Sequence, residues 1–344
     1  MNKFILKKIN GLDDAVLQSI RLYDVDFYEY RNINIEQKKE YTINRIKNIC
    51  SKENNIAFAV YRQGKPMAIW AIYKDDFDSD IFEINIYKIA YFIILEDNTS
   101  FWDGIISASL DHLAYQLHHN NKSSYFLIGL NTNLLRNPII FNILVRKGFH
   151  YIHTLLTYQM QKNEFANLRL PHSSGFNIRE AREEDVEKVM DLAKRSFKYS
   201  RLLLDPFLDK EKGKNLLAIS AKNSILNGFV DIMYVAEVEK KIVGYYSGKK
   251  KMIKEFNLGF GEGVISAVDE EYRGLGIFKD LNTNLLGWFY RNTDFAELGT
   301  YIANTPVHKT WNNNGLSIVR GTHQLAFYIS AEDKRYSDSK KESY

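Results

Sequence analysis

Residues Val268-Asp-Glu-Glu-Tyr-Arg-Gly-Leu-Gly-Ile-Phe278 decide how this chain folds. The run Gly263–Val268 that leads into them is apolar and β-prone, which predicts a strand. Behind them, apolar side chains recur every four residues, as on one face of a helix: Ile277, Leu281, Leu285 and Phe289. The stretch therefore predicts a strand, a glycine-rich turn and the start of a helix.

The turn has the chemistry of an anion site. A helix N-terminus presents free N–H groups and the positive end of the helix dipole. Gly274 and Gly276 keep side chains away, so that backbone N–H groups can approach a phosphate, and Arg273 adds a fixed positive charge. No Gly-Lys-Ser/Thr follows as in a Walker A loop, and Phe278 replaces the packing glycine of a dinucleotide-binding turn. We expect a pyrophosphate here; the alternative is a strand–turn–helix joint with convenient glycines.

Two motifs resemble signatures of one family. Arg273-x-x-Gly276-x-Phe278 resembles the acyl-CoA loop of the GCN5-related N-acetyltransferases (GNAT), Arg/Gln-x-x-Gly-x-Gly/Ala, with Phe278 as a departure. The segment Asn304–Leu316 resembles the family's second signature, Asn-x-x-Ala-x-x-x-Tyr-x-x-x-Gly-Phe. The resemblance implies an α/β fold with a mixed α+β sheet and acetyl-CoA as co-substrate. It implies coenzyme contacts at Val268, Arg273, Gly274, Leu275, Gly276, Ile277, Asn304 and Trp311.

Composition sets bounds on the class of protein. The 344 residues suit two domains, and 45% hydrophobic with 26% charged residues indicates a globular protein. A net charge of +4 argues against a nucleic-acid binder. The single Cys50 excludes an internal disulfide framework and fits a reducing compartment. The first residues do not resemble a signal peptide, and the apolar run Ile89–Leu95 is too short for a membrane span. We expect a cytoplasmic location and no membrane partner.

The segment 166–176 is predicted to be a linker, because it is polar and contains Pro171 and Ser173-Ser-Gly175. It separates an N-terminal domain (1–165) from a catalytic domain (177–330), and the charged tail 331–344 is expected to be mobile. In the second domain we expect strands at 177–180, 231–237, 242–247, 263–268, 295–303 and 321–330, with helices starting near 183, 209, 277 and 306.

The first half carries a weak repeat of the second. Asn137 to Gly148 has the same spacing as Asn304 to Gly315, and Ile56–Tyr73 resembles the hairpin predicted at 231–247. Where the phosphate loop should lie, Leu95–Gly104 carries three carboxylates and one glycine, and these carboxylates would repel a pyrophosphate. We therefore predict two tandem GNAT-like domains, of which the first is degenerate and has lost coenzyme binding.

A further resemblance concerns the acceptor. The segment Phe197–Pro206 resembles the Ser-Arg-Phe…Asp-Pro segment of the TDP-fucosamine acetyltransferase group, which acetylates nucleotide-linked amino sugars. Phe77–Phe82 resembles a segment near the start of that group's N-terminal domains, and Asn223-Ser224 resembles the end of its second helix. The resemblance implies that Ser200, Arg201 and Asp205 bind the substrate, with Arg201 able to grip a pyrophosphate.

Acyl transfer to an amine needs a base for the acceptor ammonium, and an acid can assist the leaving thiolate. The family's usual acid, a tyrosine, is replaced here by Trp311, which we interpret as a packing residue because an indole cannot protonate sulfur. Tyr301 or His308 is the candidate acid, although either can equally be structural. Glu262, on the strand before the phosphate loop, is the candidate base; the alternative is a solvent-facing strand end.

The remaining charged groups do not indicate another site. The run Lys249–Lys251 could meet a nucleotide phosphate, but such a run is usually a solvated face. His118 and His119 are adjacent and would point apart on a helix, so no metal site is predicted.

The sequence thus predicts an acetyltransferase that acts on an amino sugar, expected to be nucleotide-linked, by direct attack in a ternary complex. Cys50 lies in the wrong half to carry the acyl group. Two alternatives stay open: a GNAT enzyme for another small amine or amino acid, and a non-catalytic acyl-CoA-binding module. A homodimer is also left open.

Overall fold

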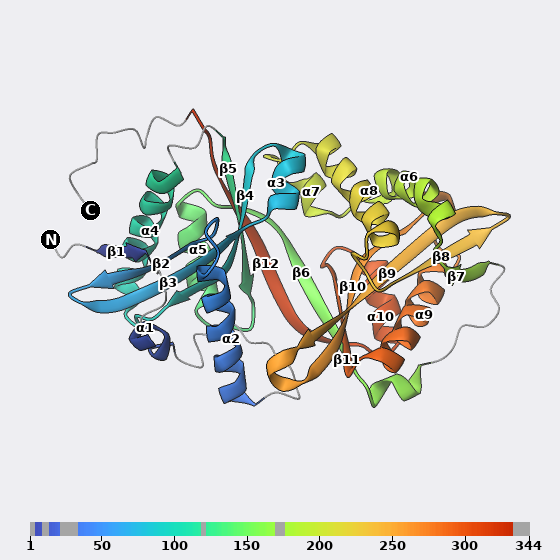
Figure 1. The fold of residues 1–344 in the computed structure, drawn as a ribbon, viewed down its shortest axis with the longest axis horizontal. Coiled ribbons are helices and arrows are strands. Elements are labelled where there is room, and N and C mark those ends of the chain that lie inside the picture. The colour runs from blue at the N-terminus through green and yellow to red at the C-terminus, as the bar shows by residue number, and fades with distance from the viewer. Residues whose placement is uncertain (1–3, 9–13, 21–33, 118–121, 169–175, 333–344) are drawn as a thin grey trace. The chain divides into compact units, whose positions relative to one another are not determined.

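The computed structural model describes residues 4–8, 14–20, 34–117, 122–168 and 176–332. They fall into two compact units (Figure 1). The N-terminal unit consists of the described residues of 1–153 and 322–344, and the C-terminal unit consists of those of 154–321. Most of the predicted linker and of the predicted tail lies outside the described residues, as do His118 and His119.

The N-terminal unit is built on a mixed sheet with the strand order β1-β2-β3-β4-β5-β12. The pairs are antiparallel except β4 with β5, which is parallel. Its strands are β1 (Ile5–Lys8), β2 (Ile56–Arg62), β3 (Lys65–Lys74), β4 (Asn85–Ile94), β5 (Ser124–Asn131) and β12 (Ser317–Ile329). Its helices are α1 (Asp14–Gln18), α2 (Ile35–Cys50), α3 (Asp76–Phe82), α4 (Trp102–Leu117) and α5 (Asn137–Arg146).

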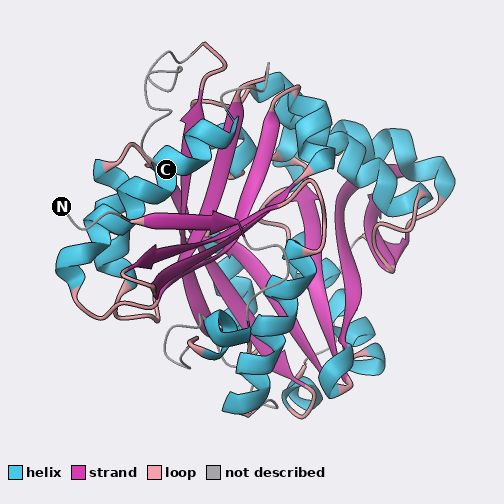
Figure 2. Cartoon of the chain, turned by 60° about the vertical axis from the view of Figure 1, so that its left-hand side comes forward, coloured by secondary structure: helices cyan, strands magenta, loops and turns pink. Residues whose placement is uncertain are grey.

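Helices cover both faces of this sheet, as Figure 2 shows. Alternate residues of β2 and β3 point to opposite faces. Phe58 and Trp70 pack with α4 and α5 on one side, whereas Ala59 and Ile69 pack with α1 and α2 on the other. Because both faces are covered, the strands are apolar nearly throughout, and the two layers of helices each have their own core.

The C-terminal unit repeats the plan, with the strand order β6-β11-β10-β9-β8-β7 and one parallel pair, β10 with β11. Its strands are β6 (His150–Gln161), β7 (Asn177–Glu180), β8 (Ile232–Val238), β9 (Lys241–Ile253), β10 (Leu258–Val268) and β11 (Phe295–Tyr301). Its helices are α6 (Val186–Ser196), α7 (Arg201–Leu204), α8 (Lys210–Leu226), α9 (Ile277–Asn292) and α10 (Thr305–Asn313). The mixed α/β fold and the predicted hairpins are confirmed.

The internal repeat also holds in three dimensions. In each unit a helix connects the two parallel strands, and a second helix then ends at a glycine with positive φ. These glycines are Gly148 (φ 100°) and Gly315 (φ 85°). A long strand follows each of them, β6 in one case and β12 in the other.

These two long strands are exchanged between the units. In β12, Thr322–Ile329 pairs with β5 of the N-terminal unit, whereas in β6, Leu155–Gln161 pairs with β11 of the C-terminal unit. The units therefore differ at these strands from the consecutive segments 1–165 and 177–330 that the sequence suggested. The signal for strands was correct, but only cross-strand pairing shows which sheet each one joins.

In the C-terminal unit α9 and α10 lie on one side of the sheet, and α6, α7 and α8 lie on the other (Figure 1). Strand β10 begins at Leu258, five residues before the predicted start. Glycines obscure this part of the strand in the sequence, yet the fold uses them for close packing. A Cβ at Gly261 would lie 2.2 Å from the Phe289 ring of α9. Gly261 thus faces α9, and the alternate residues, including Glu262, face the other side.

This packing gives a stability prediction with a matched pair of variants. Gly261→Ala forces a methyl group into the Phe289 ring and should lower the free energy of unfolding by about 1–3 kcal/mol. Gly287→Ala lies inside α9, where a Cβ has only the Arg291 side chain 3.8 Å away. It should raise stability by about 0.5–1 kcal/mol through helix propensity. Urea denaturation of both variants measures this, and equal effects would contradict the close approach of α9.

Candidate active site

The site is centred on the place where β10 and β11 separate. They pair only from Phe260 with Phe295 to Glu262 with Glu297, and both strands continue beyond that point. On its other edge, β10 has a bulge between Gly263 and Ser266 where it pairs with β9. A bulge bends a strand and increases its twist, which carries β10 away from β11. The result is a wedge between two strands whose backbone groups face each other without pairing.

Ser247 holds the bulge in place. This residue of β9 is fully buried, and its Oγ accepts the Ile265 N–H and donates to the Ile265 C=O, each at 3.2 Å. The hydroxyl thus satisfies two backbone groups that the irregular pairing would otherwise leave without partners. The sequence analysis missed Ser247, since nothing in the chain indicates that it stands opposite the bulge.

The predicted turn follows at the end of β10. Gly274 (φ 83°) and Gly276 (φ 87°) adopt left-handed backbone conformations that favour glycine, and no heavy atom lies within 4 Å of a Cβ built at either. Gly276 is the N-cap of α9, so the first N–H groups of the helix open onto this space. Leu275 is 61% exposed, whereas Ile277 is buried in the core and anchors the helix. The predicted strand, turn and helix are confirmed.

Ion pairs and a hydrogen bond hold the turn against the neighbouring elements. Asp269 is 1% exposed and lies 2.9 Å from Arg195 of α6 and 3.2 Å from Lys241. The Arg195 guanidinium, followed by Lys241, lowers the pKa of Asp269 to about 2 despite its burial. Arg273 donates to the Ser196 carbonyl at 2.9 Å. Arg273 therefore ties the turn to the end of α6, and its guanidinium also lies 3.6 Å from the Glu270 carboxylate.

The predicted acceptor segment reaches the end of β11. The phenol oxygen of Tyr301 accepts the Arg201 backbone N–H at 2.9 Å, and burial raises the pKa of this tyrosine. Ser200 caps α7 by accepting from the Leu202 N–H, and Asp205 accepts from the Phe207 N–H. Ser200 and Asp205 are buried, so they shape the loop. The structure thus brings Tyr301 together with Ser200 and Arg201.

His308 and Asn304 have structural partners. The His308 Nε2 donates to the Tyr301 carbonyl at 2.9 Å, so the proton lies on Nε2, and Nδ1 accepts from the Tyr158 hydroxyl at 3.0 Å. Both ring nitrogens are engaged, and this geometry does not support the predicted acid role of His308. The Asn304 amide donates to Thr300 at 2.9 Å, which fixes the start of α10.

Trp311 is a packing residue, as the sequence analysis interpreted it. It is 2% exposed, and its indole N–H donates to Asn282 of α9 at 3.0 Å. It also stacks edge-on against Tyr158. The side chain therefore joins α10 to α9 and β6, and this position does not support the predicted contact with coenzyme. Phe278 stacks on Tyr246 and packs against the core of the unit.

Glu262 is the last residue of β10 that pairs with β11, and its side chain faces away from α9. It forms an ion pair with Lys251 of β9, and its side chain is 40% exposed. Val268 lies half-buried at the end of the same strand. Glu262 and Val268 thus mark the two ends of the part of β10 that borders the wedge.

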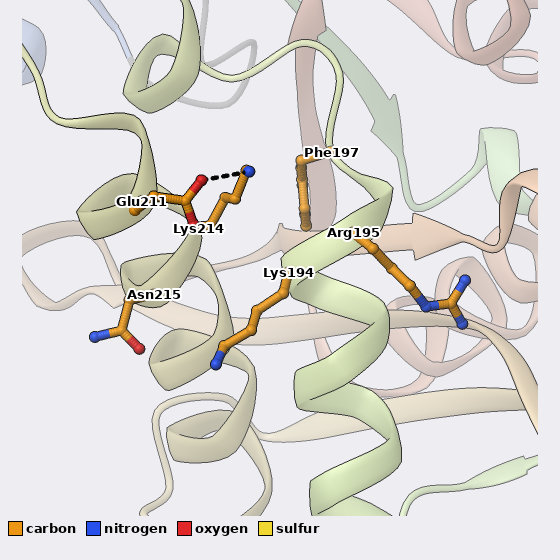
Figure 3. A pocket seen from close by; sticks show the side chains of 6 residues that line it. All are labelled: Lys194, Arg195, Phe197, Glu211, Lys214 and Asn215. Carbon is orange, nitrogen blue, oxygen red and sulfur yellow. Dashed lines mark hydrogen bonds and ion pairs between the residues drawn. The ribbon is translucent and has the colours of Figure 1, made fainter.

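A cavity of about 640 Å³ lies between α6 and α8 (Figure 3). It is lined by Lys194, Arg195, Phe197, Glu211, Lys214 and Asn215. Lys214 pairs with Glu211 at 2.6 Å, and Arg195 extends away from Lys194 (Figure 3). Arg195 forms its ion pairs outside this lining, with Asp269 at 2.9 Å and Asp191 at 3.0 Å. Two of the three cations in the lining, Lys214 and Arg195, are thus ion-paired within the protein, and Arg195 connects the cavity through Asp269 to the turn at Gly274 and Gly276.

The corresponding turn of the N-terminal unit is ion-paired internally. Glu96 pairs with Lys65 at 3.3 Å, and Asp97 pairs with Arg136. Asp103 pairs with Lys147 at 2.8 Å and with Arg146 at 3.6 Å. The carboxylates that the sequence predicted to repel a phosphate thus have their counter-charges within the protein.

The start of α4 in this unit is also covered. The Trp102 indole donates to the Glu96 carbonyl at 2.9 Å, and the ring is 2% exposed. A Cβ at Gly104 would lie 2.8 Å from the Phe4 ring, so this ring packs on the first turn of the helix. Side chains occupy the space that stays open around Gly274 and Gly276. This supports the prediction that the unit has lost coenzyme binding.

Among the described residues, no group of three or more His, Cys, Asp or Glu side chains is placed to hold a metal ion. Among the helices of the same residues, none is long and apolar enough to cross a membrane.

No protein-family model matches the chain. No curated protein matches it in sequence. Solved structures do match it. A GCN5-related N-acetyltransferase from Sphaerobacter thermophilus is 11% identical, with a TM-score of 0.59 over 95% of this chain and 96% of the other. A tandem GNAT protein from the clavulanic acid biosynthesis pathway is 10% identical, with a TM-score of 0.56 over 96% and 100%. The chain has the tandem GNAT fold.

A third match is a region described as a GCN5-related glucosamine N-acetyltransferase in a fungal multi-domain GH3 beta-N-acetylglucosaminidase. It is 10% identical, with a TM-score of 0.62 over 95% of this chain and 38% of the other. At these identities the likeness concerns the fold.

The two turns predict one coenzyme site per chain. Isothermal titration with acetyl-CoA should give a stoichiometry near one, and Gly276→Asp should abolish binding, because its carboxylate would occupy the helix N-terminus in place of a phosphate. Gly64→Asp is the matched control, since Gly64 also has positive φ (78°) and open space but lies in the β2–β3 hairpin. Two equal sites, or equal loss in both variants, would contradict the prediction.

The position of Trp311 predicts a structural effect. Trp311→Phe leaves the buried Asn282 oxygen without its donor, which should cost about 1–3 kcal/mol of the free energy of unfolding, beyond the lost packing. Trp288→Phe, at a half-buried position of α9, should cost less. Acetyl-CoA affinity should stay close to that of the unmodified chain in both variants. A selective loss of affinity in Trp311→Phe would show that the indole contacts the coenzyme.

Proposed function

We propose that the chain is an N-acetyltransferase that transfers acetyl from acetyl-CoA to the amine of an amino sugar, with a nucleotide-linked sugar as the expected acceptor. One observation carries the proposal. In a single unit, the wedge between β10 and β11 opens beside the turn at the start of α9, and Tyr301 at the end of β11 contacts the segment Ser200–Asp205. A thioester and an amine could therefore meet at one place.

The coenzyme would use both features of β10 and α9. Its pyrophosphate fits the N–H groups around Gly274 and Gly276, with Arg273 as counter-charge. Its pantetheine arm carries amides and can add to the open edge of β10 as an extended peptide adds to a sheet. Val268 stands where the arm would leave the turn. Alignment of two bound reactants can supply roughly 7–11 kcal/mol of the barrier.

The transfer would proceed by direct attack in a ternary complex. Burial raises the pKa of Cys50 to about 11, so its sulfur is a thiol at neutral pH and not a nucleophilic thiolate. Burial also keeps the Tyr301 phenol protonated, as an acid requires. Accepting the Arg201 N–H uses a lone pair of the phenol oxygen and not its hydrogen. We therefore assign to Tyr301 the protonation of the leaving sulfur.

Two lines support an amino sugar as acceptor. The segment Phe197–Pro206 resembles that of nucleotide-amino-sugar acetyltransferases, and one structure with the same fold is described as a glucosamine N-acetyltransferase region. The cavity between α6 and α8 is lined by Phe197, the first residue of this segment, and by Lys194 of α6. Lys194 could meet a phosphate of a nucleotide-linked sugar there.

Two other functions remain as alternatives. A GNAT enzyme for another amine or amino acid would use the same wedge and turn. A non-catalytic acyl-CoA-binding module is favoured by one observation, since the usual tyrosine acid is here the buried Trp311.

Release of coenzyme A thiol separates the three functions. The chain is incubated with acetyl-CoA and a panel of TDP- and UDP-amino sugars, glucosamine and amino acids. We expect release with amino sugars and highest kcat/KM with a nucleotide-linked one. Release only with amino acids or other amines selects the second function. Tight acetyl-CoA binding without release for any amine selects the module.

Arg201 tests the acceptor side. Arg201→Ala removes the guanidinium but keeps the backbone N–H that bonds to Tyr301. Since a charge-assisted bond contributes about 1.5–3 kcal/mol, the acceptor KM should rise about tenfold or more, with coenzyme KM near its original value. Arg182→Ala, in an exposed pair with Glu184, serves as control and should change neither constant. If both constants rise in Arg201→Ala, the side chain supports the fold or the coenzyme site.

A further inference from the structure

Three alternate residues of β11 form a row on the face away from α9: Glu297, Gly299 and Tyr301. Between them, Leu298 packs into the core with α9, which fixes the direction of the row. Same-face residues are about 6.5–7 Å apart along a strand, so a carboxylate and a phenol flank one glycine. Gly299 is exposed, and a Cβ there would meet only Leu155 atoms, at 3.6 Å or more. The row therefore has an open position at its centre.

Glu297 is a buried carboxylate at the last position of β11 that pairs with β10. It is 8% exposed, and its Oε1 accepts the side-chain amide of Gln159 at 3.3 Å. Gln159 is fully buried and in turn accepts from Gln161 at 2.6 Å. Burial of a carboxylate costs several kcal/mol. The side-chain amides of Gln161 and Gln159 form a hydrogen-bonded chain that ends on Glu297 and orients its carboxylate. Glu297 thus places a fixed carboxylate at the vertex of the wedge, on the same face of β11 as the open position at Gly299.

Glu262 is a less suitable proton acceptor than its cross-strand partner Glu297. Its charge is already paired with Lys251, and its side chain is 40% exposed. The charged side chains that the register places closest on this face are Glu262 itself, directly opposite Glu297, and Lys249, opposite Glu262 in β9.

We propose that Glu297 holds the acceptor ammonium over Gly299 and accepts its proton. The inference rests on the proposed function and extends it. Glu297 takes the place of Glu262 as the base and contacts the acceptor nitrogen, and Glu262 acts only through its charge. The inference also defines the acceptor as a primary amine that enters as its ammonium ion.

One ammonium proton passes to a Glu297 oxygen, and the free amine attacks the thioester carbonyl. The C–N bond forms and the C–S bond breaks, and the electron pair leaves on sulfur. The second nitrogen proton is lost as the amide forms, and the sulfur receives a proton from the Tyr301 hydroxyl, which regains one from the amide nitrogen through solvent. Glu297 then releases its proton to water.

The test compares two isosteric variants. Glu297→Gln should lower kcat/KM for the acceptor at pH 7 by at least about a hundredfold, the scale of general-base catalysis. As the pH is raised, the kcat/KM of Glu297→Gln should rise in proportion to the hydroxide concentration. The kcat/KM of the unmodified enzyme should instead reach a plateau. Glu297→Asp should recover part of the rate. Glu262→Gln should lose about tenfold or less and keep the plateau.

Binding measurements keep the outcomes distinct. Acetyl-CoA affinity and urea denaturation should be alike in the unmodified chain, Glu297→Gln and Glu262→Gln, which excludes misfolding as the cause. If the chain is active and Glu262→Gln, instead of Glu297→Gln, loses the plateau, the assignment of Glu297 is wrong and the proposed function stands. A chain that binds acetyl-CoA but acetylates no amine overturns both. A fall in Glu297→Gln with an unchanged pH profile shows a structural role and likewise overturns the inference.

Discussion

The candidate site depends on a parallel strand pair that stops pairing after three residues. Backbone N–H and C=O groups need hydrogen-bond partners, so separating two strands of a sheet costs free energy. Here the opening is stabilised from both sides. Ser247 satisfies the bulged residue on the β9 edge, and Phe289 of α9 packs directly on Gly261 of β10. Once β10 diverges, the turn at its end, the start of α9 and the row on β11 take their positions from it.

The sequence predicts those parts of the site whose chemistry is local. A turn with Gly274 and Gly276 between an apolar strand and a helical pattern has few alternatives, and the spacing of Asn304 to Gly315 is visible in one line of sequence. Ser247, Asp269 and Glu297 could not be found in this way, because their roles come from cross-strand register and from ion pairs to residues distant in the chain. The roles of His308 and Trp311 likewise depend on partners in other elements, Tyr158 and Asn282.

The two units show how one fold can keep or lose a binding site. Both have a parallel pair, a connecting helix and a turn between them. In the C-terminal unit the turn carries glycines at 274 and 276, and Arg273 and Asp269 hold it against neighbouring elements. In the N-terminal unit the same place is filled by Trp102 and Phe4, and its charges are internally paired. Filling an anion site with aromatic rings converts a polar opening into core, so the unit gains packing where it gives up a ligand.

The exchanged strands have a consequence for how the chain emerges from the ribosome. The edge of β5 at Asn131 is completed only by Thr322 and the residues after it. At about 5–20 residues per second, this edge waits roughly 10–40 s for its neighbour, and an unpaired strand edge is a template for association with other chains. Nascent chains should therefore depend on chaperones or on provisional pairing with β6, and a ribosome that stalls in the C-terminal unit would release a protein with an open sheet.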